Sequence, residues 1–264
     1  MNKRYGVWAA AACAVLAVGA SGCGKDSDDK GGRTGGGTDK PAITTSGVEK
    51  LSAQQISEKA KAELLKATSM RMKIDGTDGG ERIRMNLALD TTGNCRGSIS
   101  PDGTGVIEIV KVGDRVWMKP DEAAWKLQLG PQQGAETAKL FSGKWLSGTT
   151  SDEGLKEMAE SCDLKSLQSE AASESFDDDF TKGTPETLNG QQVIPLKGRN
   201  DKGNPETLYV AITGKPYPVK FVETGKDGGT VELSDYDKPI PTDTPTEAES
   251  INFAEFEDEL GGGA

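Results

Sequence analysis

The hydrophobic pattern has a helical period at the start of the main body of the chain. From Ile56 to Ala67, apolar residues recur every three or four positions, and charged residues fill the positions between them. This spacing places the apolar residues on one face of an α-helix. Ser52 and Gln55 precede the run at the spacing of a capping box, which starts a helix. The pattern therefore predicts an amphipathic helix that begins near Ser52.

The period then changes to two. In residues 70–75 and 82–89, apolar and polar residues alternate, and the turn sequence GTDGG separates the two runs. Such alternation predicts two half-buried antiparallel strands joined by a hairpin. Turn sequences recur at Gly113-Asp114, Asn189-Gly190 and Asp227-Gly228-Gly229. Each lies between apolar runs and predicts a further hairpin.

A region of helical composition separates the two groups of strands. Residues 120–129, 134–146 and 151–167 are rich in Ala, Glu, Lys, Leu and Met, which favour helices. The acidic stretch 170–179 is predicted to be an exposed loop. The order of helix, strands, helices and strands predicts an α+β fold built on an antiparallel sheet. In the polar segment that follows residue 239, the apolar side chains that could dock are Ile251, Phe253, Phe256 and Leu260.

The N-terminus has the pattern of an export signal. Lys3 and Arg4 precede a run of small and apolar residues, 7–20. This run is shorter than the roughly 20 residues that a membrane-spanning helix needs. The sequence Ala20-Ser21-Gly22-Cys23 then resembles the lipobox of bacterial lipoproteins, although Ala20 stands where that motif usually has Leu.

The lipobox resemblance implies that Cys23 carries a diacylglyceryl group and that the chain is cleaved before it. Two or three acyl chains, palmitate among them, would give a stable anchor. The alternative is plain secretion, because Val18-Gly19-Ala20 also suits a small-residue cleavage site. Cys23 would then be a free thiol.

These patterns divide the chain into four parts. We expect a signal peptide in residues 1–22, a flexible tether rich in Gly, Ser and Asp in 23–48, one folded domain in 49–245 and an acidic tail in 246–264. The predicted location is the outer, extracytoplasmic face of the cell membrane, with the lipid anchor as the membrane contact.

Charge and chemistry exclude several classes of function. The net charge of -11 becomes -13 when Lys3 and Arg4 leave with the signal, so nucleic acid is not an expected partner. The chain has no histidine, which removes Ser-His-Asp catalysis and His-based zinc sites. Every Gly-Lys pair lacks the Ser or Thr of a phosphate loop, and the acidic run 177–179 lacks the spacing of an EF-hand. We therefore expect no enzyme, no metal and no cofactor, with paired carboxylates as the remaining catalytic alternative.

Two cysteines remain in the main body, Cys95 and Cys162. In an exported protein such a pair is expected to form a structural disulfide. A redox-active or metal-binding pair is the alternative, although neither cysteine belongs to a CxxC motif.

Four segments, in this order, resemble the LppX/LprG lipoproteins of actinobacteria, which are relatives of the LolA-type carriers. They are ISEKAKAELLKATSMRMKIDG, VKVGDRVWMKPDEAAWKL, TLNGQQVIPLKG and KPYPVKFVETGKDGGTVELSDYDKPI. The resemblance covers about residues 56–245. It implies a curved antiparallel β-sheet, a half-open barrel, with helices covering its concave face. It also implies a monomer with an apolar cavity that carries or presents acyl chains of a lipid or another amphipathic molecule.

The matching cavity residues come from the alternating strands and from the region that covers them. A dry, filled core would require the same apolar side chains, so that alternative stays open. The alternative function is a non-catalytic envelope lipoprotein that docks a protein partner. The predicted ligand-binding residues are Met72, Ile74, Ile83, Met85, Leu87, Leu89, Trp117, Trp125, Leu127, Phe141, Trp145 and Leu146.

Overall fold

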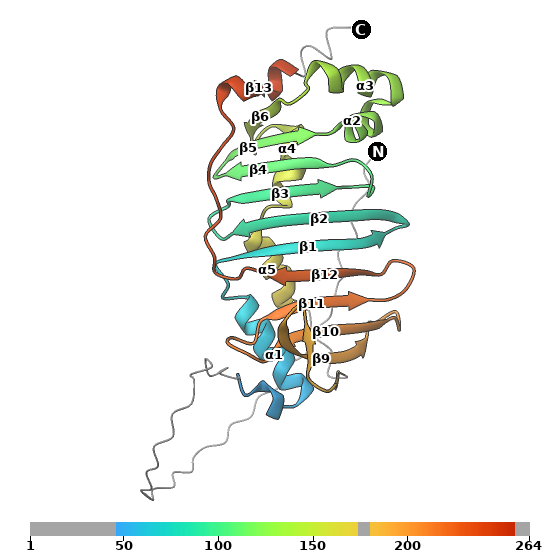
Figure 1. Ribbon diagram of the computed structural model, residues 1–264, viewed down its shortest axis with the longest axis vertical. Helices are drawn as coiled ribbons and strands as arrows, with labels where there is room; N and C mark the ends of the chain where they lie inside the picture. Colours follow the sequence, from blue (N-terminus) through green and yellow to red (C-terminus); the bar gives the residue numbers. More distant parts are fainter. Residues whose placement is uncertain (1–45, 174–179, 257–264) are drawn as a thin grey trace, which may run out of the picture. The chain divides into compact units, whose positions relative to one another are not determined.

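One curved sheet of thirteen strands organises the residues that the computed structural model describes, 46–173 and 180–256 (Figure 1). The strands are β1 (Ser69–Asp78), β2 (Glu81–Asp90), β3 (Cys95–Ser100), β4 (Ile107–Val112), β5 (Arg115–Pro120), β6 (Trp145–Thr149), β7 (Thr181–Lys182), β8 (Glu186–Leu188), β9 (Gln191–Arg199), β10 (Pro205–Ala211), β11 (Pro218–Glu223), β12 (Gly229–Ser234) and β13 (Ser250–Asn252). Their order is β13-β6-β5-β4-β3-β2-β1-β12-β11-β10-β9-β7, with β8 paired to β9.

The sheet consists of two antiparallel meanders that meet at β1 and β12. The first runs from β1 to β6 and the second from β9 to β12. Met72 of β1 lies between Leu87 of β2 and Leu233 of β12, so β1 has a partner on both sides. The terminal strands β13 and β7 do not pair with each other. The α+β prediction of an unclosed, half-open barrel is therefore confirmed.

One pair of strands departs from the predicted antiparallel arrangement. β13 runs parallel to β6, with Ser250 opposite Trp145 and Asn252 opposite Ser147. The sheet is therefore mixed. This strand comes from the segment that was predicted to be an acidic tail.

The α-helices in the described ranges include α1 (Ala53–Leu64), α2 (Glu122–Leu129), α3 (Pro131–Leu140), α4 (Glu153–Glu160) and α5 (Leu164–Ser173), and residues 253–256 are helical as well. The predicted capping box starts α1, because the Ser52 hydroxyl accepts the Gln55 N–H at 3.2 Å and the Gln55 side chain accepts the Ser52 N–H at 3.1 Å. Buried Ile56 and Ala60 pack this helix onto β10 and β11.

Two helical predictions need correction. The helix predicted over 134–146 ends at Leu140, because Gly143 adopts a left-handed conformation (φ 74°) and residues 145–149 form β6. The stretch 151–167 divides into α4 and α5 at Asp163, whose carboxylate accepts the N–H groups of Lys165 and Ser166. α5 then continues through residues 170–173, which were predicted to be loop. The acidic run 177–179 lies outside the described residues.

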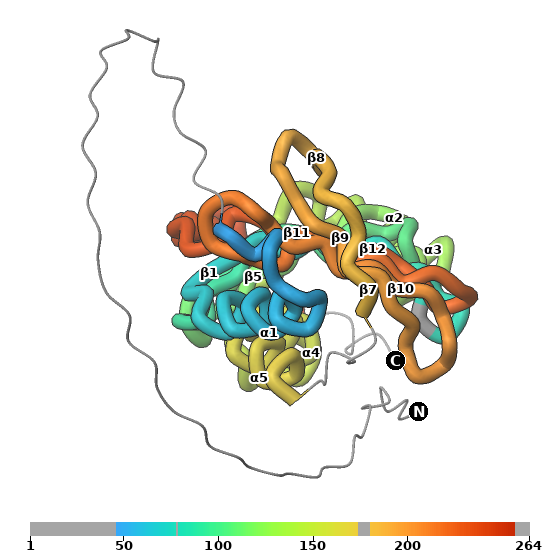
Figure 2. The backbone as a smooth tube through the Cα atoms, turned by 90° about the horizontal axis from the view of Figure 1, so that it is seen from below, coloured from blue at the N-terminus to red at the C-terminus, as the bar shows by residue number. Residues whose placement is uncertain are grey.

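Helices α1, α4 and α5 cover the same face of the sheet, its concave face (Figures 1 and 2). The main hydrophobic core lies between this face and the helices. A second core lies under α1 at the β9–β10 end and includes Val48, which is 1% exposed. The folded part therefore already includes the last residues that were predicted to be tether.

The segment between β12 and β13, residues 235–249, runs along one side of the strands (Figure 1). We refer to it as the C-terminal strap. Ser69 donates to the Lys238 carbonyl at 2.6 Å, Arg96 donates to the Asp243 carbonyl, and Lys144 donates to the Ala248 carbonyl at 2.6 Å. The strap leads into β13 and then to two buried residues, Phe253 and Phe256.

The predicted docking of Ile251, Phe253 and Phe256 is thereby confirmed, whereas Leu260 lies outside the described residues. Among the helices of residues 46–173 and 180–256, none has both the length and the apolar composition that crossing a membrane requires.

Candidate functional site

The helix-facing side of the sheet is an apolar surface that several strands build in register. Strand alternation puts every second residue on this face. Pairing then aligns these residues across neighbouring strands. The two central rows are Val231–Ile74–Met85–Ile99–Ile107 and Leu233–Met72–Leu87–Gly97–Ile109.

A glycine in the second row, Gly97, lets two neighbouring strands lie unusually close together. A Cβ atom at Gly97 would lie 1.9 Å from the Asn86 carbonyl oxygen of β2. No side chain fits at that distance, so only glycine lets β2 and β3 approach here.

The helices cover most of the second row and its neighbours, although Leu233 at the end of this row is only partly buried. Leu87, Leu89 and Ile109 are 0% exposed, as are Leu155 of α4 and Leu164 of α5, and all five belong to one core. In this part of the site, the protein's own side chains fill the space between sheet and helices.

The first row is covered less completely. Ile74, Met85, Ile107 and Val231 are partly buried and pack against the edge of the main core. Ile83 pairs with Gly76 on the same face and is also partly buried. We refer to these five residues, which come from β12, β1, β2 and β4, as the apolar strip. The strip can offer a hydrocarbon group contact with apolar side chains that the helices leave accessible.

The predicted disulfide is confirmed. Cys95 of β3 and Cys162, just after α4, are bonded with their Cα atoms 5.5 Å apart, and they are 1% and 0% exposed. A redox-active pair would need access to a partner thiol, so this burial favours a structural bond. The bond ties the helix layer to the middle of the sheet.

An aromatic cluster closes one end of the layer. The Phe256 ring lies 5.4 Å from Trp125 and 5.0 Å from Phe141, and Phe253 lies 6.0 Å from Phe256. The C-terminal residues therefore pack against α2 and the end of α3.

Nine of the twelve predicted cavity residues lie in this layer, and three do not. Met72, Leu87, Leu89 and Leu146 are in the filled core, and Trp125 and Phe141 are in the aromatic cluster. Ile74, Ile83 and Met85 belong to the apolar strip. The three that the structure places elsewhere are Trp117, Leu127 and Trp145.

Trp117 and Trp145 lie on the other face of the sheet. Trp117 is paired with Val110, one position out of phase with the core residues Val116 and Met118, and the Arg115 guanidinium stands 4.8 Å from its ring centre. The Lys119 ammonium stands 4.6 Å from the Trp145 ring centre. Leu127 is 56% exposed on α2.

Sequence reasoning missed two residues of the strip, Ile107 and Val231. Their signal was present, because VIEIV and TVELS alternate in the same way as the first two strands.

Hydrogen bonds between polar side chains connect the segments that lead into β1 and β11. The Tyr217 hydroxyl donates to Asp237 at 2.6 Å, and Lys215 donates to the same carboxylate at 3.1 Å. The hydrogen bond from Tyr217, together with one from the Thr68 N–H, holds the pKa of the Asp237 carboxyl well below its usual value. Tyr236 stacks on Tyr217 with the ring centres 3.9 Å apart, and burial raises the pKa of Tyr236.

The described residues contain no group of three or more His, Cys, Asp or Glu side chains that could hold a metal ion. Two surface hollows are lined mainly by polar residues. One lies on the helix-free face of the sheet, and the other lies between the loop at Thr92 and the helix layer at Lys156 and Asp163.

The fold and the site define a class of protein: an α+β protein with one curved sheet, whose concave face is covered by helices. No protein-family model matches the chain, and a search of the curated proteins found no match.

Solved structures are similar to this chain. LprF from Mycobacterium bovis is 14% identical, with 74% of this chain and 97% of LprF covered and a TM-score of 0.47. The lipoprotein LppX from Mycobacterium tuberculosis is 15% identical, with 72% and 98% covered and a TM-score of 0.41. An uncharacterized conserved protein from Thermus thermophilus is 12% identical, with 76% and 98% covered and a TM-score of 0.34. LppX, one of the lipoproteins named in the sequence resemblance, is among these structures.

Proposed function

We propose that the protein is an exported, membrane-anchored lipoprotein that binds the acyl chain of a lipid, or another amphipathic molecule, along the apolar strip. In this role it is a non-catalytic carrier or presenter. The binding residues are those of the strip, and the buried layer beside it is their support.

One observation carries this proposal: an in-register row of apolar side chains remains partly uncovered beside a filled core. Covering such a row with hydrocarbon is worth about 25 cal/mol for each Å² removed from water. The strip includes Met85, and Met72 lies next to it in the buried row. Their unbranched thioether chains can adapt to a ligand that has no fixed shape.

The proposed anchor is Cys23, which lies outside the described residues. The described part begins at Ser46, whose N–H donates to the Ile212 carbonyl at 2.7 Å. A polar stretch of about 20 residues would therefore separate the acylated cysteine from the first described residue. Such a segment lets the strip reach a nearby bilayer while the anchor keeps its local concentration high.

The test is mass spectrometry of lipids that co-purify with the protein from its own membrane. We expect a bound lipid in the wild type and about tenfold less in Met85→Gln, because a polar amide replaces half-buried apolar contact. Leu140→Gln is the matched control, since Leu140 is 76% exposed and lies outside the strip. It should retain the wild-type amount.

Two results would contradict the proposal. One is a wild-type protein that carries no lipid after gentle extraction. The other is equal loss of lipid from Met85→Gln and Leu140→Gln, which would indicate non-specific adsorption. Thermal melts of all three proteins separate loss of binding from loss of folding.

A further inference from the structure

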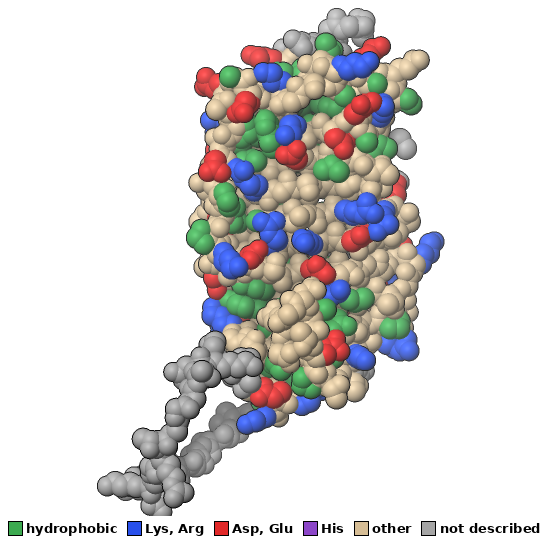
Figure 3. Space-filling view, viewed as in Figure 1, with side chains coloured by type: hydrophobic (Ala, Val, Ile, Leu, Met, Phe, Trp, Pro, Cys, Tyr) green, Lys and Arg blue, Asp and Glu red, His purple; other side chains and the backbone are tan. Residues whose placement is uncertain are grey.

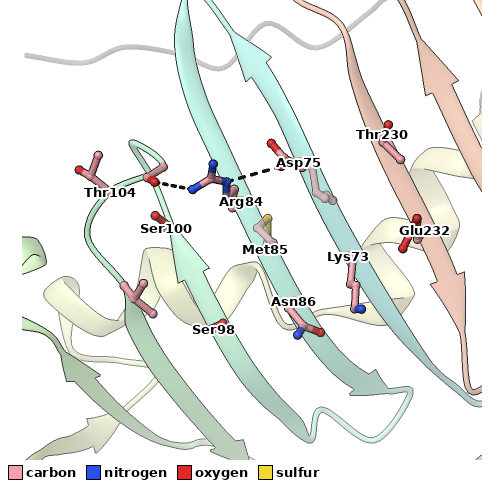
Figure 4. Close-up of a pocket in the computed structure, with 13 residues that line it drawn as sticks. Lys73, Asp75, Arg84, Met85, Asn86, Ser98, Ser100, Thr104, Thr230 and Glu232 are labelled. Carbon is pink, nitrogen blue, oxygen red and sulfur yellow. Dashed lines mark hydrogen bonds and ion pairs between the residues drawn. The ribbon is translucent and has the colours of Figure 1, made fainter.

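The helix-free face of the sheet carries a polar hollow of about 520 Å³ (Figure 4). Two rows of side chains cross it, Lys73–Asn86–Ser98 and Asp75–Arg84–Ser100. By strand alternation, these residues point away from Ile74 and Met85 of the apolar strip. The polar side chains of the hollow and the side chains of the strip therefore lie on opposite faces of the same strands, although Ile74 and Met85 also border the hollow. Basic side chains lie over the middle strands of this face, with acidic side chains between them (Figure 3).

The carboxylates of the hollow already have cationic partners. Arg82 makes two hydrogen bonds of 2.9 Å to Asp75, and Arg84 approaches the same carboxylate at 3.5 Å. The hydrogen bond from Arg82 lowers the pKa of Asp75. Glu232 pairs with Lys220 at 3.5 Å.

Several hydrogen-bond donors of the hollow have no partner. Lys73 is exposed and makes no ion pair with any residue that the structure describes. The Ser100 hydroxyl is buried without a hydrogen-bond partner, in a residue that is 6% exposed. Leaving such a group unsatisfied is unfavourable. Asn86 accepts a bond from Arg71 through its oxygen, which leaves its NH₂ group available.

The rim of the hollow is held in place from both sides. The Arg84 guanidinium donates to the Gly103 carbonyl at 2.6 Å, as Figure 4 shows. Asp102 accepts the N–H groups of Thr104 and Gly105 at 3.0 and 3.1 Å. A Cβ atom on Gly105 would lie 2.6 Å from the Ala124 backbone of α2, so this loop fits closely against the helix. Fixed donors lose little entropy when they bind a ligand.

We propose that this hollow is a binding site for a phosphate or phosphodiester group, with Lys73, Ser100 and Asn86 as the donors to its oxygens. The charged side chains of the lining are two cations, Lys73 and Arg84, and two carboxylates, Asp75 and Glu232. Arg82 and Lys220, which are not part of the lining, pair with these carboxylates. The charge of Lys73 is therefore available to an anion, in a chain whose net charge is -11. A lysine beside hydroxyl and amide donors is a common way to hold phosphate oxygens.

The hollow has room for a ligand that is larger than one phosphate ion. Sites for small molecules measure roughly 300–1,000 Å³, and this hollow lies within that range. The phosphate can belong to a soluble phosphorylated molecule or to a lipid headgroup. The donors proposed for this site, Lys73, Ser100 and Asn86, are not residues of the apolar strip, although Ile74 and Met85 of the strip also border the hollow.

The experiment is phosphorus NMR of the full-length protein in neutral detergent micelles, with two probes. Inorganic phosphate reports a soluble ligand, and micelles doped with phosphatidylglycerol report a lipid headgroup. We expect a saturable shift with at least one probe. Lys73→Gln should weaken that binding about tenfold, and Ser100→Ala should weaken it about fivefold.

Lys197→Gln is the matched control, because Lys197 is an exposed lysine of β9 outside the hollow. It should bind like the wild type. Saturable binding of either probe that Lys73→Gln and Ser100→Ala weaken and Lys197→Gln preserves supports the site, and the probe that binds identifies the source of the phosphate. No saturable shift with either probe, or equal weakening by all three variants, overturns the proposal and leaves water as the partner of Ser100. Either result is independent of the lipid found by mass spectrometry.

Discussion

At the scale of single residues, Asp237 illustrates how one side chain joins distant segments. Its backbone is left-handed (φ 58°), a conformation that Asp and Asn tolerate better than most residues. From there its carboxylate accepts hydrogen bonds from Thr68, Lys215 and Tyr217. The residue thus connects the start of β1 to the start of β11.

Asp237→Asn should reduce stability more at neutral pH than in acid. The pKa of Asp237 is lower in the folded protein, so the carboxylate stabilises the fold fully above the unfolded pKa of about 4 and loses this contribution progressively as the pH falls below it. Asn keeps the left-handed backbone favourable, but it removes the charge and replaces one of the two acceptor oxygens with an NH₂ group that faces hydrogen-bond donors. Thermal melts of both proteins should show a larger deficit in the melting temperature of the variant at neutral pH than in strong acid. An equal deficit under both conditions would contradict the assignment.

The sequence predicts the strand residues better than the tryptophans. Met70 to Asp75 alternate cleanly, so their two faces can be assigned by period alone. In β5, Val116, Trp117 and Met118 are all apolar, and the pattern does not show which of them faces the core. The Arg96–Asp243 contact of the C-terminal strap lies on the Trp117 face. The local sequence pattern around Trp117 cannot show that a segment more than 100 residues later contacts this face of the sheet.

At the scale of elements, the disulfide connects two parts of the fold that share no hydrogen-bonded ladder. Cys95 belongs to β3, and Cys162 follows α4, 67 residues later. The bond therefore fixes the helix layer to the sheet next to the filled core.

Replacing both cysteines by alanine should lower the free energy of unfolding by about 4 kcal/mol, because a loop of this length is no longer closed in the unfolded chain. Denaturant titrations of the wild type and the double variant measure the change. A reducing agent should shift the wild type towards the variant and leave the variant unchanged. A wild type that is insensitive to reduction would contradict a stabilising role.

Short strands were the elements that the sequence did not predict. β6 and β13 have five and three residues. They are strands because β6 pairs with both β13 and β5, so their hydrogen bonds come from distant parts of the chain. The residues before β6 favour a helix, so the predicted helix extended into it. Longer elements such as α1, β1 and β2 were predicted because their own periodicity specifies them.

At the scale of the whole molecule, the predicted acylation site, Cys23, lies outside the described residues, and a polar stretch of sequence separates it from the folded domain. Cys23→Ser should therefore move the protein from the membrane fraction to a soluble or unprocessed form without changing its folding. Cell fractionation and gel mobility measure this. Cys13→Ser is the control, because Cys13 lies within the predicted signal and should not affect anchoring. Unchanged membrane association of Cys23→Ser would support plain adsorption instead of an anchor.

Across the whole chain, the fold class, the helix-facing rows and the disulfide could be predicted, whereas the extent of the cavity could not. Alternation specifies which side chains are apolar on one face, but whether helices cover all of that face depends on where α4 and α5 end. Asp163 and the turn after α4 determine this locally. The result is a filled region next to an accessible strip.

The position of β1 between β2 and β12 also affects how the chain matures during synthesis. Gly76 of β1 pairs with Ile83 of β2, which is made almost immediately, but its other partner is Gly229 of β12, which is made only after all of the helices α2 to α5. Until then, β1 presents a bare edge that can recruit other chains. A prematurely terminated product would keep that edge permanently, so cellular proteases have a physical basis for removing incomplete copies while sparing finished ones.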